Sequence, residues 1–473
     1  MGDPVLEAHQ VEERVYLLSG PTPISIRDQM LRGVLLARRL VECGYINSTD
    51  RPLLVVGAGA GGATAAITAA IDKKIPTVLV EYHPSPFLAQ ACARTRFVDP
   101  TQYDWPLDHW PRAKFPWGPS LPIPLGFRAA MGRDLSLIWT SRLKKYENDP
   151  SCLLEVDYDD HVTDLDFVPN AGGHAAIDVT FDVRKSQRFG AMIWAAGFGQ
   201  ENCTVAAKPS DPSALGRLLY EGQPFWGPDD FTDLRSNVPS PSVLISGSGD
   251  GALQDYLRVT TQLDSASSVF NACAIPEEII PSLQSAEDRA HRGRAWAHHR
   301  QHEAPYLAEL DSIIDQSVRF ALASSSVCNA LRGVLANVVP VKLVYRERFL
   351  TSHYGLNRFL VLLISAFIEK QSHTKTLFPN TVISHISAAN PGHQCLQMGP
   401  FGPRAAGQYS KQDMLLHHAC FGKDHHVTLE SGDGIPISET FNVIIVRHGM
   451  PPRDPKDPFP DRWKHILPLH LPP

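Results

Sequence analysis

The chain has 473 residues, more than one hydrophobic core usually serves, so we expect two or more domains. It carries 44 basic and 50 acidic side chains, and the resulting net charge of −6 argues against nucleic acid or an anionic membrane as a partner. The eight cysteines are scattered and form no CxxC pair, which favours reduced thiols in the cytoplasm and argues against dithiol chemistry. The expected partner is therefore a small-molecule substrate, and a homo-oligomer stays open.

Residues 1–50 read as a helical preamble. Apolar side chains recur at helical spacing in Ile24–Cys43, so we expect a helix that packs on the first domain. Residues 1–15 contain neither the basic leader nor the apolar core of a secretory signal. The longest apolar run, Phe359–Ile368, is too short to span a bilayer. We therefore expect neither a secretory signal nor a membrane span.

A glycine-rich stretch at Leu53–Glu81 has the plan of a dinucleotide-binding βαβ unit. It reads LLVVGAGAGGATAAITAAIDKKIPTVLVE: an apolar strand, a glycine turn, an alanine-rich helix and a second strand that ends in a carboxylate. The first glycine permits the tight bend, the second lets the backbone approach a pyrophosphate, and the third lets the helix lie close to the strand. The final carboxylate can accept hydrogen bonds from ribose hydroxyls. We assign to this cofactor site Gly57, Gly59, Gly61, Gly62 and Glu81.

An aromatic and proline-rich loop follows at Ala93–Gly118. Asp104 and His109 are candidates there for acid–base catalysis, because an imidazole titrates near neutral pH. Arg94, which we assign to the cofactor site, and Arg96 can bind a cofactor phosphate or a substrate carboxylate. A structural salt bridge explains these arginines equally well. The aromatic side chains of the loop fit a flat cofactor, although core packing is their more common role.

A buried strand is expected at Ala191–Ala196, after a helical segment near Leu125–Tyr146 and several strand segments. It runs into Gly197 and Gly199. This ending, AAGFG, resembles the closing strand of a flavoprotein's nucleotide domain, which brings the backbone close to a bound dinucleotide. On that resemblance Gly197 joins the cofactor site.

A second, weaker glycine motif follows the apolar strand Val243–Ser246. The sequence GSGDG has no glycine at the sixth position of the motif, so a turn unrelated to nucleotides stays an alternative. The next strand is hard to locate: the segment VFNACAIPEE offers only Asn271 where a ribose-binding acid or a phosphate-binding arginine is wanted. The second site is thus less well supported than the first. Its assigned residues are Gly247, Gly249 and Gly251.

The rest of the chain repeats the order of the first half. Pro276–Val338 has helical periodicity and reads as an insertion, and later strands lead to a buried strand that ends at Gly449. Arg447 and His448 lie where open α/β sheets bind ligands, or they cap the sheet. The predicted fold class is α/β, with two Rossmann-like dinucleotide-binding domains and a helical insertion in the second. The predicted segments are the preamble (1–50), the first nucleotide domain (51–235), the second (236–275 and 336–450), the insertion (276–335) and a proline-rich tail (451–473).

These motifs, in this order, resemble the two-dinucleotide-domain flavoproteins, and in plan most closely the flavin-dependent monooxygenases that use NAD(P)H. The resemblance covers about residues 51–260 and the final strand more loosely. It implies that the domain at 51–235 binds FAD and that the second glycine motif binds NAD(P)H. The monooxygenase fingerprint FxGxxxHxxx(Y/F) is kept only in part, since Phe231 replaces its histidine and Arg235 its aromatic residue, beside Phe225 and Gly227. The cysteine pair of the disulfide-reductase branch is absent as well.

We therefore expect an FAD-dependent oxidoreductase that is reduced by NAD(P)H and that oxidises or oxygenates a small organic substrate. One alternative is a nucleotide-binding sensor or assembly component that retains this fold without turnover. Another is an oxidase that takes electrons from its substrate directly. A metal is not expected, because the histidines of AHHRQHEA at 297–304 lack an HExxH arrangement and fit a solvated helix face.

Overall fold

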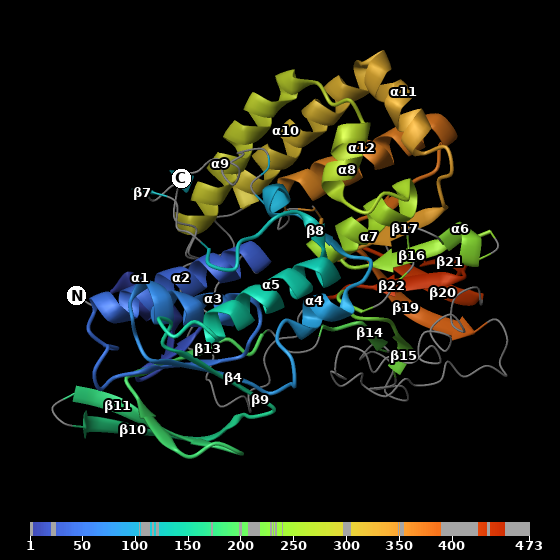
Figure 1. The fold of residues 1–473 in the computed structure, drawn as a ribbon. Helices are drawn as coiled ribbons and strands as arrows, with labels where there is room; N and C mark the ends of the chain where they lie inside the picture. The colour runs from blue at the N-terminus through green and yellow to red at the C-terminus, as the bar shows by residue number, and fades with distance from the viewer. Residues whose placement is uncertain are drawn as a thin grey trace.

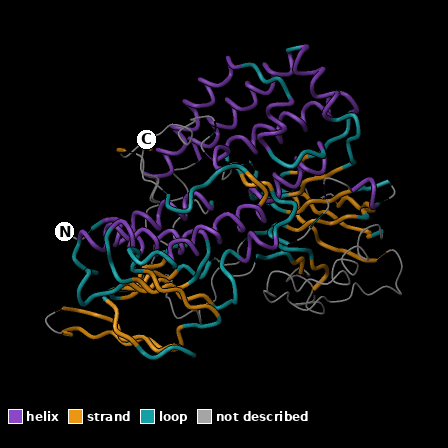
Figure 2. Tube along the Cα trace, in the orientation of Figure 1, coloured by secondary structure: helices purple, strands orange, loops and turns teal. Residues whose placement is uncertain are grey.

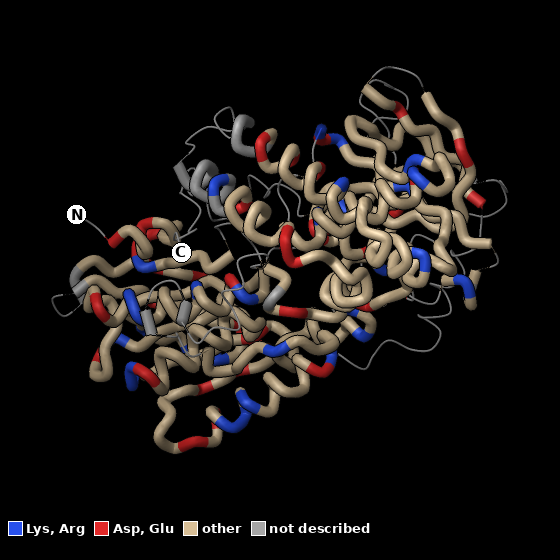
Figure 3. The backbone as a smooth tube through the Cα atoms, turned by 90° about the horizontal axis from the view of Figure 1, so that it is seen from above, with Lys and Arg blue, Asp and Glu red and all other residues tan. Residues whose placement is uncertain are grey.

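The computed structural model has two α/β halves, each built on a parallel sheet, and a group of helices beside the second sheet (Figures 1 and 2). It describes residues 3–19, 25–103, 105, 114–115, 118–119, 123–171, 174–197, 201–206, 218–227, 229, 231, 234–238, 240–296, 304–348, 350, 354–388, 424–432 and 436–449. Basic and acidic residues are interspersed along both halves (Figure 3). None of the described helices is long and apolar enough to cross a membrane.

The first half is organised around a six-stranded sheet in the order β1-β2-β13-β3-β4-β9. Neighbouring strands in it are parallel, except for the antiparallel pair β1 and β2. The central strand β3 (Leu53–Val56) is buried at every position, because helices cover one face of the sheet and a second sheet covers the other. The other strands are β1 (Gln10–Glu12), β2 (Val15–Leu17), β4 (Thr77–Glu81), β9 (Leu154–Tyr158) and β13 (Ala191–Trp194).

The helical layer of the first half contains α2 (Ile26–Glu42) packed on α3 (Ala60–Ile67). The two helices approach closely because Gly33 has no side chain: a Cβ there would lie 2.6 Å from the Gly61 carbonyl oxygen. The helix expected within residues 24–43 is thus confirmed, and strand β2 before it joins the sheet. The first half also contains α1 (Pro4–His9), a π-helical turn (Thr68–Asp72), α4 (Leu88–Cys92) and α5 (Gly132–Glu147).

An antiparallel sheet covers the opposite face of the first sheet. It consists of β10 (Val162–Ala171), β11 (His174–Phe181) and β12 (Gln187–Phe189). Ile177 of β11 shares a buried apolar cluster with Val56 of β3. The first half therefore has three layers: helices, parallel sheet and antiparallel sheet.

The second half repeats this three-layer plan around a parallel sheet in the order β18-β17-β16-β22. Helices α7 and α12 pack on one face, where their apolar side chains join those of β16 and β17 in one cluster. A three-stranded antiparallel sheet packs on the other face. These elements are β16 (Val243–Ser246), α7 (Asp250–Thr261), β17 (Val341–Val344), α12 (Gly355–Ser372), β18 (Leu377–Phe378), β19 (Thr381–Ala388), β20 (His425–Ser431), β21 (Pro436–Phe441) and β22 (Val443–Val446).

Helices are inserted between α7 and β17, so the predicted fold class, including its helical insertion, is confirmed. They are α8 (Ala266–Ala272), α9 (Ile280–Trp296), α10 (Ala304–Ala323) and α11 (Ser325–Val334). The first four residues of the segment VFNACAIPEE lie in α8, so Asn271 is on a helix and does not follow a strand of the sheet. The side chain of Ser265 accepts a hydrogen bond from the Ser268 N–H at 3.0 Å, a helix cap that outweighs the strand propensity of Val269 and Phe270.

The loop between α4 and α5 crosses from the first half to the second. Tyr103 in this loop lies against Tyr354, with ring centroids 4.7 Å apart. Trp105 packs on Phe359 of α12, with ring centroids 5.5 Å apart. These contacts fasten the two halves together. The remaining short elements are β5 (Phe97–Val98), η2 (Pro100–Tyr103), β6 (Lys114–Phe115), β7 (Gly118–Pro119), β8 (Ala130–Met131), β14 (Thr204–Ala206), β15 (Leu218–Glu221), α6 (Leu234–Asn237) and η4 (Glu277–Ile279).

Candidate functional site

The first glycine turn lies at the carboxyl edge of the first sheet, between β3 and α3. Gly57 has a φ of 103°, and a Cβ on it would lie 2.5 Å from the Ala195 carbonyl oxygen. A Cβ on Gly62 would overlap the carbonyl oxygen of Gly57. Both positions therefore exclude a side chain, as the motif requires.

Gly59 differs from its neighbours because it faces open space. A Cβ there would meet no atom within 4 Å, and Gly59 is the residue that precedes α3. The first N–H groups of α3 are thus approachable from the sheet edge, as a pyrophosphate requires. Gly61 points the other way, since a Cβ there would lie 2.7 Å from Leu18 and 3.1 Å from the Gln29 carbonyl oxygen. Gly61 serves the packing of α2 on α3.

Glu81 is buried at the end of β4, beside this turn. One carboxylate oxygen accepts a hydrogen bond from the Ala58 N–H at 2.6 Å, and the other accepts one from the His83 N–H at 3.0 Å. A carboxylate oxygen can accept more than one hydrogen bond. Glu81 is therefore fixed in place and still able to bind ribose hydroxyls.

The second glycine turn repeats the geometry of the first. Gly247 has a φ of 140°, and a Cβ on it would overlap the Arg447 carbonyl oxygen, as one on Gly57 would approach Ala195. A Cβ on Gly249 would meet nothing within 4 Å, whereas one on Gly251 would lie 3.0 Å from the Phe225 ring. The open glycine and the packed glycine thus occupy the same places in both turns.

The strand after the second turn is β17, and it ends without a carboxylate. In the first sheet Val56 pairs with Val80, and Glu81 follows. In the second sheet Ser246 pairs with Val344, so the corresponding residue is Tyr345. Tyr345 is buried, and the next residues include two exposed arginines, Arg346 and Arg348. The sequence VKLVYRER contains this signal, but it lies beyond the inserted helices and not directly after α7.

The strands that close the two sheets also correspond. Trp194 of β13 pairs with Val56, and Val446 of β22 pairs with Ser246. The residues that follow are Ala195, Ala196 and Gly197 in the first sheet and Arg447, His448 and Gly449 in the second. Gly197 and Gly449 both have positive φ, at 86° and 75°. The backbone after β13 and the backbone after β22 therefore correspond, but the side chains are small after β13 and large after β22.

His448 lies at the carboxyl edge of the second sheet. Its Nε2 and the hydroxyl of Ser246 are joined by a hydrogen bond of 2.9 Å. Burial and the positive charge of Arg346 lower the pKa of His448. Of the two residues that the sequence placed at this edge, His448 faces the turn region, and Arg447 turns into the protein.

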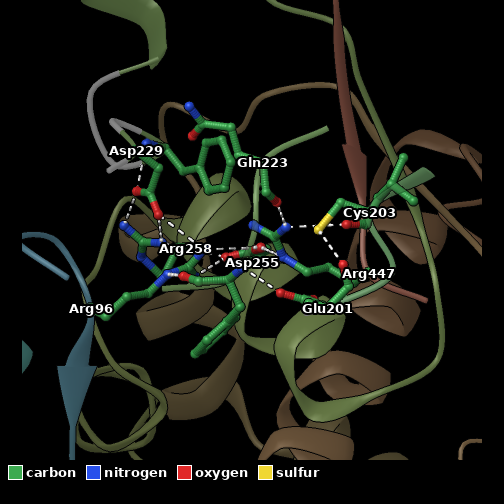
Figure 4. A network of polar contacts seen from close by, with 11 residues as sticks. Arg96, Glu201, Cys203, Gln223, Asp229, Asp255, Arg258 and Arg447 are labelled. Carbon is green, nitrogen blue, oxygen red and sulfur yellow. Dashed lines mark hydrogen bonds and ion pairs between the residues drawn. The ribbon is translucent and has the colours of Figure 1, made fainter. Parts of the chain in front are cut away.

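Arg447 belongs to a buried ionic network (Figure 4). Its Nε donates to Asp255 of α7 at 2.8 Å, and Arg96 pairs with the same carboxylate. Asp229 pairs with Arg96 at 3.0 Å and with Arg258 at 2.6 Å. Burial alone would raise the pKa of Asp229, but the two guanidinium groups outweigh it and hold that pKa well below its usual range.

The network shows which of its two candidate roles, ligand binding or a structural salt bridge, Arg96 has. Arg96 is 2% exposed and joins the first half to Asp229 and Asp255 of the second, so its salt bridges are structural. Arg94 is exposed and forms no ion pair within the part of the chain that the structure describes. The thiol of Cys203 lies at the edge of the network, and burial raises its pKa to about 12.

Some predicted residues lie outside the described part of the chain. These are the acid–base candidates Asp104 and His109 and the histidines of the segment 297–303. Among the described residues, no three His, Cys, Asp or Glu side chains gather as metal ligands would.

The duplicated parallel sheets and glycine turns define a fold of two Rossmann-like units. No protein-family model matches the chain, and no curated protein matches its sequence.

Several solved structures align with the chain at low sequence identity and low TM-score. The FAD-bound cadaverine monooxygenase of Erwinia amylovora is 10% identical, with a TM-score of 0.40 over 86% of this chain and 80% of its own. The bacillithiol disulfide reductase of Staphylococcus aureus is 12% identical, with a TM-score of 0.37 over 85% and 77%. The ornithine N-hydroxylase of Kutzneria sp. 744 is 11% identical, with a TM-score of 0.35 over 88% and 83%.

Proposed function

We propose that the chain is an FAD-dependent oxidoreductase that is reduced by NADPH in preference to NADH and oxidises a small organic substrate. The observation that carries this proposal is the pair of glycine turns. In each turn a Cβ on the neighbouring glycines would meet other atoms at 3.0 Å or less. A Cβ on Gly59 or on Gly249, each at a helix N-terminus, would meet no atom within 4 Å. Two such turns provide for two dinucleotides.

The side chains around each turn support the assignment of the cofactors. Beside the first turn, Glu81 offers a carboxylate to a ribose, and Ala195 and Ala196 leave the backbone of the closing strand approachable. Beside the second, Tyr345 replaces the carboxylate, and Arg346 and Arg348 follow. An arginine after this strand suits the 2′-phosphate of NADP, whereas a carboxylate would repel it.

The residues of this chain would bind and orient the two cofactors. A bound flavin would supply the electron-transfer chemistry. The N–H groups of α3 and α7 would hold one pyrophosphate each. The ionic network between Arg96 and the carboxylates of Asp229 and Asp255 would keep the two sheets in a constant relative position. That fixed geometry favours transfer between two bound rings, because the reacting atoms must be held close together.

Phe231 bears on the kind of oxidation. It is 3% exposed, and the guanidinium carbons of Arg96 and Arg258 lie 5.8 Å and 5.6 Å from its ring centre. Where the monooxygenases have a histidine, this chain thus has a buried ring packed beneath two arginines. Phe231 therefore offers no polar group for oxygen activation at the position of that histidine.

Anaerobic reduction tests the proposal. The purified protein is expected to be yellow, to release FAD on denaturation and to be bleached faster by NADPH than by NADH. Arg346→Ala should lower the NADPH rate at limiting nucleotide about tenfold and leave the NADH rate unchanged. Purification without flavin, together with no uptake on reconstitution, would overturn the proposal. Bound FAD that neither nucleotide bleaches would favour the sensor, and bleaching by substrate alone would favour the oxidase.

A further inference from the structure

Asp250 places an acidic side chain inside the second glycine turn. It is the first residue of α7 and stands between the open Gly249 and the packed Gly251. The corresponding residue of the first turn is Ala60. A carboxylate at this point would repel a pyrophosphate, because both groups are negatively charged. The protonation state of Asp250 therefore bears on nucleotide binding.

The carboxyl group of Asp250 is held by the start of α12. Its Oδ1 accepts a hydrogen bond from the Tyr354 N–H at 3.0 Å and another from Asn357 Nδ2 at 2.8 Å. Tyr354 precedes the first residue of α12 and caps that helix with no side-chain hydrogen bond of its own. Asp250 is thus oriented by two donors at the start of α12.

Asn357 provides a second, independent observation. It is fully buried, and its Oδ1 has no hydrogen-bond partner among the described residues. A buried acceptor without a donor is unfavourable, because its lost contact with water is not offset by a hydrogen bond. A neutral carboxyl could supply the missing donor, since an acid and a primary amide can pair through one N–H···O and one O–H···O bond. The amide that donates to Asp250 therefore suits its protonated form.

The burial of Asp250 also favours a neutral carboxyl. Burial raises its pKa to about 7, against the effect of the two hydrogen bonds and of Arg358. Glu287 of α9 raises this pKa further, although Glu287 itself pairs with Arg358. Both charge states of Asp250 are thus accessible near neutral pH. The other titratable groups in the region are Tyr354 before α12, Tyr103 of η2, and Arg27 and Asp28 of α2.

We propose that the nicotinamide dinucleotide binds at the second turn together with one proton, which Asp250 takes up from solvent. This inference rests on the proposed function, because it concerns the nucleotide assigned to that turn. Below neutral pH Asp250 is already neutral, and the affinity does not depend on its titration. Above neutral pH the bound state must gain a proton, so the affinity falls about tenfold per pH unit.

Anaerobic calorimetric titration with NADH, on flavin-loaded protein whose flavin has been reduced beforehand so that no hydride transfer accompanies binding, tests the proposal. NADH is the probe because it lacks the 2′-phosphate of NADPH, which titrates near pH 6. Between pH 7 and 9 the dissociation constant should rise about tenfold per unit. At pH 8, titrations in buffers of different ionisation enthalpy should show uptake of about one proton.

Asp250→Asn isolates the residue. Asparagine keeps an acceptor for Tyr354 and Asn357 and adds a donor for the Asn357 oxygen, so it imitates the neutral acid. The variant should bind NADH with the same affinity from pH 6 to 9 and without proton uptake. The matched control is Asp178→Asn. Asp178 lies on β11 and forms an exposed ion pair with Arg188 of β12, so this variant should behave as the wild type.

The outcomes separate this inference from the function on which it rests. If the wild type binds neither NADH nor NADPH at pH 6, the proposed function fails at the second site. If it binds NADH with no pH dependence and no proton uptake, only the role of Asp250 is refuted. The same conclusion follows if Asp250→Asn retains the wild-type pH dependence.

Discussion

The two glycine turns share a backbone and differ in the side chains around it. At the first turn, the residue that opens the helix and the residues that close the sheet are Ala60, Ala195 and Ala196. At the second turn, Asp250, Arg447 and His448 stand in these places. The glycine conformations and the helix N–H groups recur in both turns, so both have the backbone of a dinucleotide-binding turn. Under the proposed function, the side chains around each turn determine which dinucleotide binds and under what conditions.

The connections after the two turns differ as well. The first helix returns to its sheet directly, so β4 follows α3 and its π-helical turn. After α7 the chain forms α8, α9, α10 and α11 before it returns as β17. Because β17 still pairs with β16 in the corresponding register, the insertion leaves the turn itself intact. A sheet tolerates a long excursion when the returning strand restores the same pairing.

Replacing the first glycine of each turn should have the largest effect. Gly57→Ala and Gly247→Ala each force a side chain into a backbone of positive φ against a carbonyl oxygen, at 103° and 140° respectively. We expect a loss of about 4 kcal/mol or more in the affected half. Gly57→Ala should abolish FAD content, whereas Gly247→Ala should keep FAD and lose bleaching by NADPH. Loss of FAD from Gly247→Ala would show that the halves do not behave independently.

Breaking the ionic network around Arg96 should have the second largest effect on the protein. Arg96→Ala leaves Asp229 and Asp255 with fewer cationic partners in a buried site, and removing one partner from such a site is unfavourable by about 3–5 kcal/mol. We expect a clear fall in Tm, measured by flavin fluorescence, and slower bleaching by NADPH. Arg94→Ala, two residues away and exposed, is the control and should change stability by less than about 0.5 kcal/mol. Equal Tm values for the two variants would contradict the structural role of Arg96.

The open glycines should give a smaller and more selective effect. Gly59 and Gly249 have φ values of −72° and −74°, which alanine adopts readily, and a Cβ on either would touch nothing. Stability should therefore change by less than about 0.5 kcal/mol. A methyl group would stand where a pyrophosphate approaches, so Gly59→Ala should weaken FAD about tenfold and Gly249→Ala should weaken NADPH about tenfold. Unchanged affinities, measured by titration, would place the cofactors elsewhere.

The smallest expected effect is on the stability of Asp250→Asn. Because the pKa of Asp250 is raised to about 7 in the folded protein, the wild-type carboxyl stabilises the fold below its ordinary pKa. That stabilisation is lost as the pH rises through 7. The asparagine does not titrate, so the difference in unfolding free energy should shift in favour of the variant by about 1 kcal/mol between pH 6 and 8. Thermal unfolding of both proteins at the two pH values measures it, and parallel curves would argue against a raised pKa.

The first turn could be predicted because its requirements are local. Gly57 and Gly62 are needed within one short segment, where each excludes a side chain for steric reasons. Gly61 was assigned to the same site, but its position is used by α2, a helix that lies earlier in the chain. The partners of Arg96 are equally remote, since they come from residues 229 and 255. Tertiary contacts of this kind leave no periodic signal in the sequence.

The two apolar strand–glycine–helix units and their order can be predicted from the sequence alone, because glycine conformation and strand burial depend on neighbouring residues. That Tyr345 occupies the position corresponding to Glu81 follows only from the folded chain, since helices α8 to α11 lie between α7 and β17, which pairs with β16. The tertiary structure also decided that Asp250 meets Asn357, which lies 107 positions further along the chain. The charge and hydrogen bonding of the second turn arise from side chains that only folding brings together.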